Sequence, residues 1–155
     1  AALLKEFAPK AGPVLEVRSR HKGYCQFFEA PGRGRYASLK AAVLVNSGTA
    51  RAAEAFAAAL SELTGAPIVG EATRGDVSLS KTFNLGRSKK GLKLTVARLF
   101  PPSGKDLEGA GVRPGVDPGL TPGEIEKTRS EWAASRETAL LGDAAYDKAL
   151  EVLNK

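Results

Sequence analysis

The sequence VLVNSGTARAAE, residues 43–54, decides the fold because it joins an apolar run to an alanine-rich segment through a short polar turn. Residues 41–45 predict a short buried strand of a parallel sheet, and residues 50–63 predict a helix. The turn places Arg51 at the start of this helix, where free backbone N–H groups bind anions and a cation is unfavourable. Because Arg51 breaks this local rule, it is a candidate for a function, or for the loss of one.

Signals at both ends bound the helix predicted over residues 50–63. Thr49 or Gly48 is expected to cap its start, and Gly65 is expected to end it. Seven alanines in this segment allow the helix to approach a sheet closely, and its larger apolar residues lie on one face.

The remaining segments predict a mixed domain of strands and helices. Strands are predicted at residues 14–19, 24–29, 67–70, 77–83 and 92–100. The last two are expected to pair as a hairpin, because a basic turn joins them. Helices are predicted at residues 1–7, from a capping box at residues 121–124 to about residue 141, and from Asp143 onward. Strands that alternate with helices, together with a hairpin, predict an α/β domain.

Composition and charge exclude several classes of protein. With 155 residues, of which 43% are hydrophobic and 26% charged, the chain predicts one globular domain. No apolar run approaches the ~20 residues of a membrane span. The net charge of +6 comes from scattered Lys and Arg residues without a nucleic-acid-binding motif, so no nucleic-acid partner is expected. One cysteine, Cys25, excludes an internal disulfide and a cysteine-based zinc site, and neither a cofactor nor a metal is predicted.

Four motifs in register resemble those of the C-terminal processing (tail-specific) serine peptidases. They are VLVNSGTARAAE at residues 43–54, IVGEATRG at 68–75, LTVARLFPPSG at 94–104 and the Gly- and Pro-containing loop at 109–116. Residues 143–153 resemble the C-terminal helix of that family. The resemblance implies a ClpP/crotonase-like α/β core with parallel strands, an added β-hairpin and C-terminal helices.

The resemblance also implies a catalytic apparatus, and this chain departs from it at every position. The family uses a serine nucleophile, a lysine base and a supporting glutamine. These positions fall on Arg51, Asp76 and Ser80. Arginine stays protonated and cannot act as a nucleophile, and an aspartate beside it has no hydroxyl to activate. The resemblance therefore implies the scaffold of a peptidase without its serine and lysine.

Two interpretations of Arg51 follow, because a cation and an anion replace the serine and the lysine. A salt bridge between Arg51 and Asp76 fills the vacated site in the first, since the fold brings these positions together. In the second, Arg51 receives a carboxylate, such as a peptide C-terminus, beside the helix N-terminus. Glu54, three residues further along the helix, is a competing partner for Arg51. The candidate residues of this peptide or oxyanion site are Gly48, Thr49, Arg51 and Ala52.

The other potentially reactive side chains are expected to have structural roles. Ser47 and Lys81 are conceivable as a displaced nucleophile and base, but nothing in their spacing predicts that they meet. His21 and Cys25 are four residues apart with no third group in view, so neither catalysis nor metal binding is expected of them. Ser78 and Ser80 are expected to be polar strand residues, Arg98 and Ser103 to be structural or to line a groove, and Trp132 to be a packing residue.

The function expected from this combination is that of a pseudoprotease, which binds peptide or protein C-termini without cleaving them. Two alternatives stay open: an active serine peptidase with a relocated nucleophile or with residues outside this chain, and a structural or assembly domain that forms a homo-oligomer. Residues 1–155 are expected to be a fragment of the peptidase core without its upstream PDZ module, with residues 121–155 as a helical extension. The resemblance favours the periplasm, the cell envelope or the thylakoid lumen.

Overall fold

The computed structural model describes residues 1–86, 90–119, 121, 123–127, 130 and 143–154 as a mixed α/β domain. The elements are α1 (Ala2–Phe7), β1 (Ala11–Arg18), a 3-10 helix (Lys22–Tyr24), β2 (Gln26–Pro31), β3 (Val43–Val45), α2 (Ala52–Thr64), β4 (Ile68–Gly70), β5 (Ser78–Asn84), β6 (Gly91–Phe100) and α4 (Ala144–Leu153). Every strand predicted from the sequence is present, with its ends shifted by a few residues. No helix among the described residues is both long enough and apolar enough to cross a bilayer.

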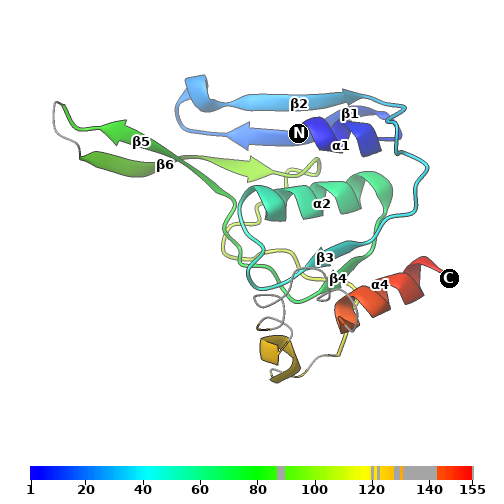
Figure 1. Ribbon diagram of the computed structural model, residues 1–155. Helices are drawn as coiled ribbons and strands as arrows, with labels where there is room; N and C mark the ends of the chain where they lie inside the picture. The colour runs from blue at the N-terminus through cyan, green and yellow to red at the C-terminus, as the bar shows by residue number, and fades with distance from the viewer. Residues whose placement is uncertain (87–89, 120, 122, 128–129, 131–142, 155) are drawn as a thin grey trace.

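Two sheets lie on opposite sides of α2 (Figure 1). The strands β2, β1, β6 and β5 form, in that order, an antiparallel four-stranded sheet, which includes the predicted hairpin of β5 and β6. The strands β3 and β4 form a parallel pair. Helix α1 packs beside α2, and α4 packs against β3 and β4. This arrangement brings the residue before α2 into contact with the segment that leads into β5.

Helix α2 is buried over most of its surface because both sheets cover it. Ala55 and Ala59 are fully buried, and Ala57 and Leu60 are nearly so. A helix that is apolar on several sides belongs in the interior of a domain, and alanine lets neighbouring backbones approach it closely. The alanine-rich composition of α2 predicted packing against a sheet, and in the structure the helix packs against both sheets.

The two ends of α2 differ in how well the sequence predicted them. The prediction that Gly48 or Thr49 caps the helix is wrong, because the N-cap residue is Arg51 and no side chain caps this end. The prediction that Gly65 ends the helix is confirmed: this residue has φ 72°, a left-handed conformation that glycine adopts without strain.

The predictions for the C-terminal part are confirmed where the structure describes it. Asp143 caps α4 by accepting hydrogen bonds from the backbone N–H groups of Ala145 and Tyr146. Thr121 and Glu124 exchange the reciprocal hydrogen bonds of a capping box. Most of the helix predicted to run to about residue 141, including Trp132, lies outside the described residues.

The parallel strands β3 and β4 meet so closely at one point that only glycine fits. Gly70 has φ 129°, and a Cβ at this position would overlap the carbonyl oxygen of Val45. The same carbonyl accepts a hydrogen bond of 3.0 Å from the N–H of Glu71. These contacts fix the end of β3, from which the turn to α2 departs.

Candidate functional site at the start of helix α2

A tight turn between β3 and α2 presents Arg51. The backbone N–H of Thr49 donates to the Asn46 carbonyl (2.9 Å), and that of Gly48 donates to the Asn46 side chain (2.9 Å). Arg51 follows with φ 58° and ψ −125°, a conformation that strains any residue except glycine. Enzymes of the α/β-hydrolase fold expose a catalytic serine on a strained strand-to-helix turn. The backbone at Arg51 has this geometry, although the side chain is a guanidinium.

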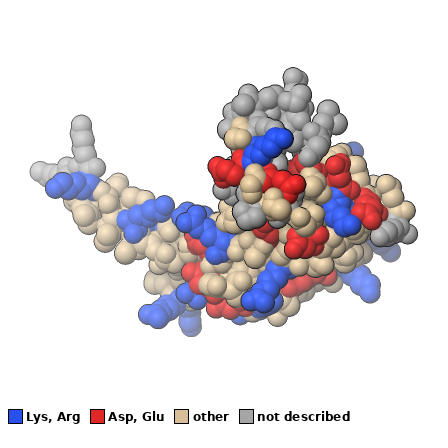
Figure 2. Space-filling model, turned by 90° about the horizontal axis from the view of Figure 1, so that it is seen from below, with Lys and Arg blue, Asp and Glu red and all other residues tan. Residues whose placement is uncertain are grey.

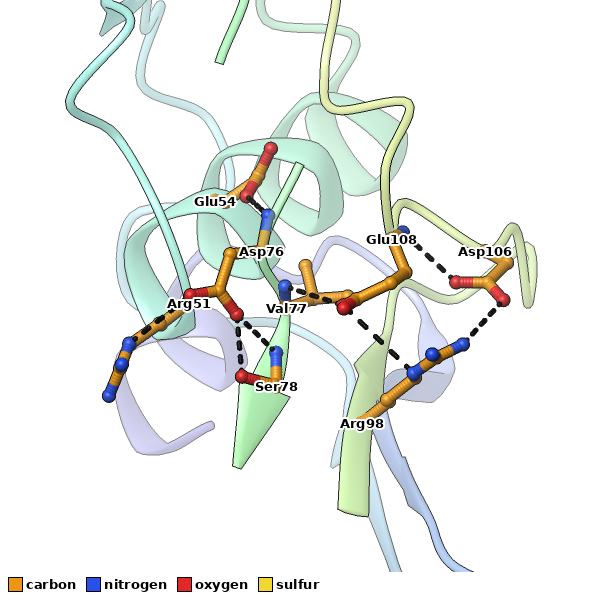
Figure 3. Close-up of polar contacts among 8 residues, drawn as sticks. All are labelled: Arg51, Glu54, Asp76, Val77, Ser78, Arg98, Asp106 and Glu108. Carbon is orange, nitrogen blue, oxygen red and sulfur yellow. Dashed lines mark hydrogen bonds and ion pairs between the residues drawn. The ribbon is translucent and has the colours of Figure 1, made fainter. Parts of the chain in front are cut away.

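Arg51 contacts Asp76 through both its side chain and its backbone (Figure 3). Its Nε lies 3.5 Å from Asp76 Oδ2, so the predicted ion pair is confirmed. Its backbone N–H donates to the Asp76 carbonyl oxygen. The two side chains are 52% and 31% exposed, so water screens their attraction and the ion pair alone adds little stability. The backbone hydrogen bond is what joins the strained turn to the residues that precede β5.

Ser78 binds the Asp76 carboxylate more directly than Arg51 does. Asp76 Oδ1 accepts a hydrogen bond from the Ser78 hydroxyl (2.5 Å) and another from the Ser78 backbone N–H (3.1 Å). These two hydrogen bonds, and then the positive charges of Arg51 and Arg74, hold the pKa of the Asp76 carboxyl below its ordinary value. Asp76 is therefore ionised at neutral pH.

We expect Asp76→Asn to lower stability at neutral pH and to have a shrinking effect as the pH falls. The folded-state pKa of Asp76 is lowered, so its contribution is complete above the ordinary carboxyl pKa of about 4 and is lost as the pH falls through the lowered value. Urea midpoints of the wild type and Asp76→Asn, measured from about pH 7 to about pH 3, test this. Asp106→Asn, which removes another paired carboxylate, is the control. A difference that grows toward acid contradicts the expectation.

Glu54 lies beneath the turn and is fully buried, so the expectation that it competes for the guanidinium is wrong. Its carboxylate accepts hydrogen bonds from the Thr73 hydroxyl and from the backbone N–H groups of Gly75 (2.8 Å) and Asp76 (3.0 Å). The Thr73 hydroxyl oxygen in turn accepts a hydrogen bond of 2.7 Å from the N–H of Val112. The buried carboxylate thereby ties the first turn of α2 to two separate loops.

Carboxylates accept hydrogen bonds from four consecutive backbone N–H groups where the chain enters β5, and Figure 3 shows those of Asp76, Val77 and Ser78. The acceptors are Glu54 for residues 75 and 76, Glu108 for residue 77, and Asp76 for residue 78. Arg98 pairs with two carboxylates next to these N–H groups. Its Nε lies 4.0 Å from Glu108 Oε2, and its Nη1 lies 3.4 Å from Asp106 Oδ2. Hydrogen bonds to charged acceptors are stronger than neutral ones, so the backbone around Asp76 is firmly placed.

Three of the four candidate anion-binding residues use their backbone N–H groups within the site itself. Those of Gly48 and Thr49 donate inside the turn, and that of Arg51 donates to Asp76. The N–H of Ala52, the first residue of α2, meets no acceptor among the described residues, and Ala52 is exposed. The site therefore offers a guanidinium and one helix-terminal N–H on the same surface.

An apolar pocket of about 500 Å³ opens beside the first turn of α2. Its lining includes Ala52, Ala53 and Phe56 of α2, Leu15 of β1, Leu79 of β5 and Leu99 of β6. A pocket of this size and lining accepts an apolar side chain. Its position next to Ala52 gives the site an apolar part as well as a cationic part.

Ser47 and Lys81 occupy different parts of the structure. The N–H of Ser47 donates to the Glu71 carboxylate (3.2 Å) in the turn before α2. Lys81 Nζ lies on the hairpin, 3.5 Å from the Tyr24 hydroxyl. Ser80, at the position that the resemblance assigns to glutamine, is partly buried in β5.

The remaining polar residues from the sequence have local partners. His21 Nδ1 accepts a hydrogen bond from the Gly23 N–H (3.2 Å), and Cys25 Sγ contacts the carbonyl of His21 (3.9 Å). Ser103 donates through its N–H (2.9 Å) and its hydroxyl (2.7 Å) to Glu62 of α2. Within the part of the chain that the structure describes, no group of His, Cys, Asp and Glu side chains is arranged to hold a metal ion.

We expect Arg51→Gly to be more stable than Arg51→Ala by about 1–2 kcal/mol. Both variants lose the same ion pair, but only alanine retains the cost of holding a side chain at φ 58°. Urea unfolding of the two variants measures the difference. Equal midpoints would show that the turn relaxes to an unstrained conformation when the guanidinium is removed.

Comparison with known proteins places this chain among peptidases. The family model described as peptidase family S41 matches residues 1–117. The carboxy-terminal processing protease CtpA of Bacillus subtilis is 39% identical over 112 residues, which cover 71% of this chain and 23% of that protein. The chloroplastic C-terminal processing peptidase of Tetradesmus obliquus is 35% identical over 107 residues, which cover 68% of this chain and 23% of that protein.

Solved structures share the fold. The photosystem II D1 C-terminal processing protease matches with a TM-score of 0.60 at 29% identity, over 77% of this chain and 30% of that one. A putative S41 protease from Bacteroides fragilis matches with a TM-score of 0.66 at 17% identity, over 98% of this chain and 40% of that one. The fold is thus that of C-terminal processing peptidases. The chain belongs to peptidase family S41, and it spans about a quarter of the length of the curated relatives it matches.

Proposed function

We propose that this chain is a proteolytically inactive S41 homologue with a ClpP/crotonase-like core, which binds the C-termini of peptides or proteins. One observation carries the proposal: a guanidinium stands on the strained strand-to-helix turn on which hydrolases expose a serine. A guanidinium has no lone pair for attack on a carbonyl and does not deprotonate in proteins. Asp76, at the position that the resemblance assigns to the lysine base, is an ionised carboxylate engaged by Ser78 and Arg51.

The backbone of the turn supports the same proposal. Acyl transfer needs N–H donors aimed at the oxygen on which negative charge develops. The N–H of Arg51 already donates to the Asp76 carbonyl, so it cannot serve an oxyanion unless the turn opens. Both the nucleophile and one possible oxyanion donor are therefore missing from the arrangement.

The same surface is suited to a carboxylate that stays bound. The ion pair with Asp76 uses Nε of Arg51, and Figure 3 shows the outer end of the guanidinium directed away from Asp76. A guanidinium binds a second carboxylate through its remaining N–H groups, and the N–H of Ala52 adds a donor at the helix terminus. The apolar pocket beside Ala52 receives a neighbouring side chain. The ligand that fits is a peptide with a free α-carboxylate and an apolar last residue.

Fluorescence anisotropy with short labelled peptides tests this function. A peptide that ends in leucine as the free acid should bind at least about tenfold more tightly than the same peptide with a C-terminal amide. Arg51→Ala should abolish this difference. Arg18→Ala is a matched control, because Arg18 is a comparably exposed arginine in an ion pair, with Glu16, in strand β1. Equal affinity for the acid and the amide would contradict the proposal.

We propose an extracytoplasmic compartment for the protein. Two of the relatives are named as chloroplastic, and two are bacterial processing proteases. The domain boundaries at residues 1–155 and 121–155 and the formation of a homo-oligomer stay predictions.

A further inference from the structure

The distal part of the β5–β6 hairpin projects from the body of the domain as an arm (Figure 1). Strand β6 pairs with β1 only over residues 98–100, whereas its pairing with β5 continues to residue 91. A bulge between Leu79 and Ser80 lies where the hairpin leaves the sheet. We define the arm as residues 80–86 and 90–95. Within the described residues, each strand of the arm has only the other strand as a β-partner.

The arm has one apolar face and one polar face. Cross-strand partners project to the same side of a hairpin, and alternate residues share that side. Phe83 pairs with Leu92 and Lys81 pairs with Leu94, so these four residues share the apolar face. The opposite face carries Ser80, Thr82, Asn84, Lys93 and Thr95. Leu92 and Leu94 are 45% and 47% exposed, so the apolar face is largely open to solvent.

All charged residues in the sequence of the arm and of the residues that connect its two strands have the same sign. The segment from residue 77 to residue 97 contains Lys81, Arg87, Lys89, Lys90 and Lys93, and no Asp or Glu. Figure 2 shows the arm with Lys and Arg side chains along it, whereas acidic side chains are gathered on the body. Lys81 lies at the base of the apolar face, 5.7 Å from the Phe83 ring centre, and Lys90 lies next to Gly91 at the outer end. The apolar face is thus bounded by ammonium groups at both ends.

We propose that this arm docks the protein on the surface of a membrane that contains anionic lipids. Leucine and phenylalanine on one face enter the boundary between headgroups and acyl chains, while lysines remain at the level of the lipid phosphates. Each lysine near an anionic surface raises the binding constant about fivefold. The arm alternates apolar and polar residues along its length and projects from the body of the domain (Figure 2), while Lys81 at the base of the apolar face contacts Tyr24 of the body (3.5 Å).

A second copy of the chain and an acidic protein both match the apolar face less well than a membrane does. A second copy of the chain would bring two all-basic arms together, and like charges repel. An acidic protein satisfies the charge, but it needs a concave surface to receive a projecting ribbon, whereas a membrane needs none. The chemistry of the arm therefore favours a lipid surface.

Vesicle co-sedimentation of the whole chain tests the proposal. The chain should bind vesicles of phosphatidylcholine with about 30% phosphatidylglycerol, and at least about tenfold more weakly when the vesicles are pure phosphatidylcholine. The double variant Leu92→Ser with Leu94→Ser should lose about tenfold or more, and Lys90→Gln with Lys93→Gln about twentyfold. Leu150→Ser is the matched control, because Leu150 is a similarly exposed leucine on α4. It should bind as the wild type does.

Several outcomes would overturn the proposal. These are equal binding to neutral and anionic vesicles, an equal loss in Leu150→Ser, and no vesicle binding by the wild type. If the chain binds polyglutamate but not vesicles, the apolar face of the arm is a binding surface for an acidic protein instead. Thermal unfolding by circular dichroism and peptide binding at Arg51 check that the arm variants remain folded. Because peptide binding depends on Arg51, a failure of the membrane test leaves the proposed function intact.

Discussion

Glu54→Ala is expected to lower the free energy of unfolding by about 3–5 kcal/mol, a large part of the stability of a small domain. Glu54 is fully buried, and its carboxylate accepts hydrogen bonds from the Thr73 hydroxyl and from the N–H groups of Gly75 and Asp76. Truncation leaves two buried donors and the partly buried N–H of Asp76 without their acceptor and creates a cavity beneath Arg51. Urea unfolding, followed by circular dichroism, measures the effect.

The control for Glu54→Ala is Glu62→Ala on the same helix. Glu62 is exposed and accepts hydrogen bonds from Ser103, so its removal should cost less than about 1 kcal/mol. Both variants change the helix propensity of α2 in the same direction, which isolates the effect of burial. Equal destabilisation of the two variants would contradict the role of Glu54 as the anchor of the turn.

Gly70→Ala is expected to destabilise the domain by about 3–5 kcal/mol. The methyl group would overlap the Val45 carbonyl, which is backbone in the paired strand and cannot rotate away. In addition, φ at this position is 129°, which a residue with a Cβ rarely adopts. The substitution forces β3 and β4 apart at the end from which the turn to Arg51 departs. Thermal and urea unfolding both test it.

Gly65→Ala separates the steric overlap from the backbone strain, which are the two causes of the destabilisation expected for Gly70→Ala. Gly65 has φ 72°, but no atom lies within 4 Å of a Cβ built on it. The expected cost is only the left-handed conformation, about 1 kcal/mol. If Gly70→Ala costs no more than Gly65→Ala, the close approach of β3 and β4 is not maintained in solution.

The elements around the site could be predicted because local signals specify them. The apolar run before Asn46, the glycine at position 65 and the aspartate at position 143 each act through neighbouring residues in the chain. The contact between Arg51 and Asp76 is not local, and it was predicted from a family resemblance that aligned both positions. Its geometry, 3.5 Å between Nε and Oδ2, agrees with that prediction.

The role of Glu54 could not be predicted from spacing alone. Three positions beyond Arg51, a glutamate on a helix is expected to be a surface partner of the arginine. Its burial is decided by loops around Thr73 and Val112, which come together only in the folded domain. The larger apolar residues of this helix, Phe56, Leu60 and Leu63, mark a different face, so the sequence carried no signal for the burial of Glu54.

The strained backbone at Arg51 also lies beyond local rules. Arginine has no preference for φ 58°, so a sequence-based interpretation puts the helix cap at Gly48 or Thr49. The tertiary hydrogen bond from the Arg51 N–H to the Asp76 carbonyl places it instead. A local rule therefore failed at the residue on which the proposed function depends, as is common at functional sites.

Labelling with a fluorophosphonate probe tests the central claim, that this S41 scaffold has no serine nucleophile, most directly. The chain is incubated with the probe beside an active serine peptidase, and modified peptides are located by mass spectrometry. We expect no labelling of the chain under conditions that label the active enzyme fully, because the family resemblance assigns the nucleophile and base positions to Arg51 and Asp76, neither of which can supply that chemistry. Stoichiometric modification of Ser47, Ser78 or Ser80 would contradict it and would identify a relocated nucleophile.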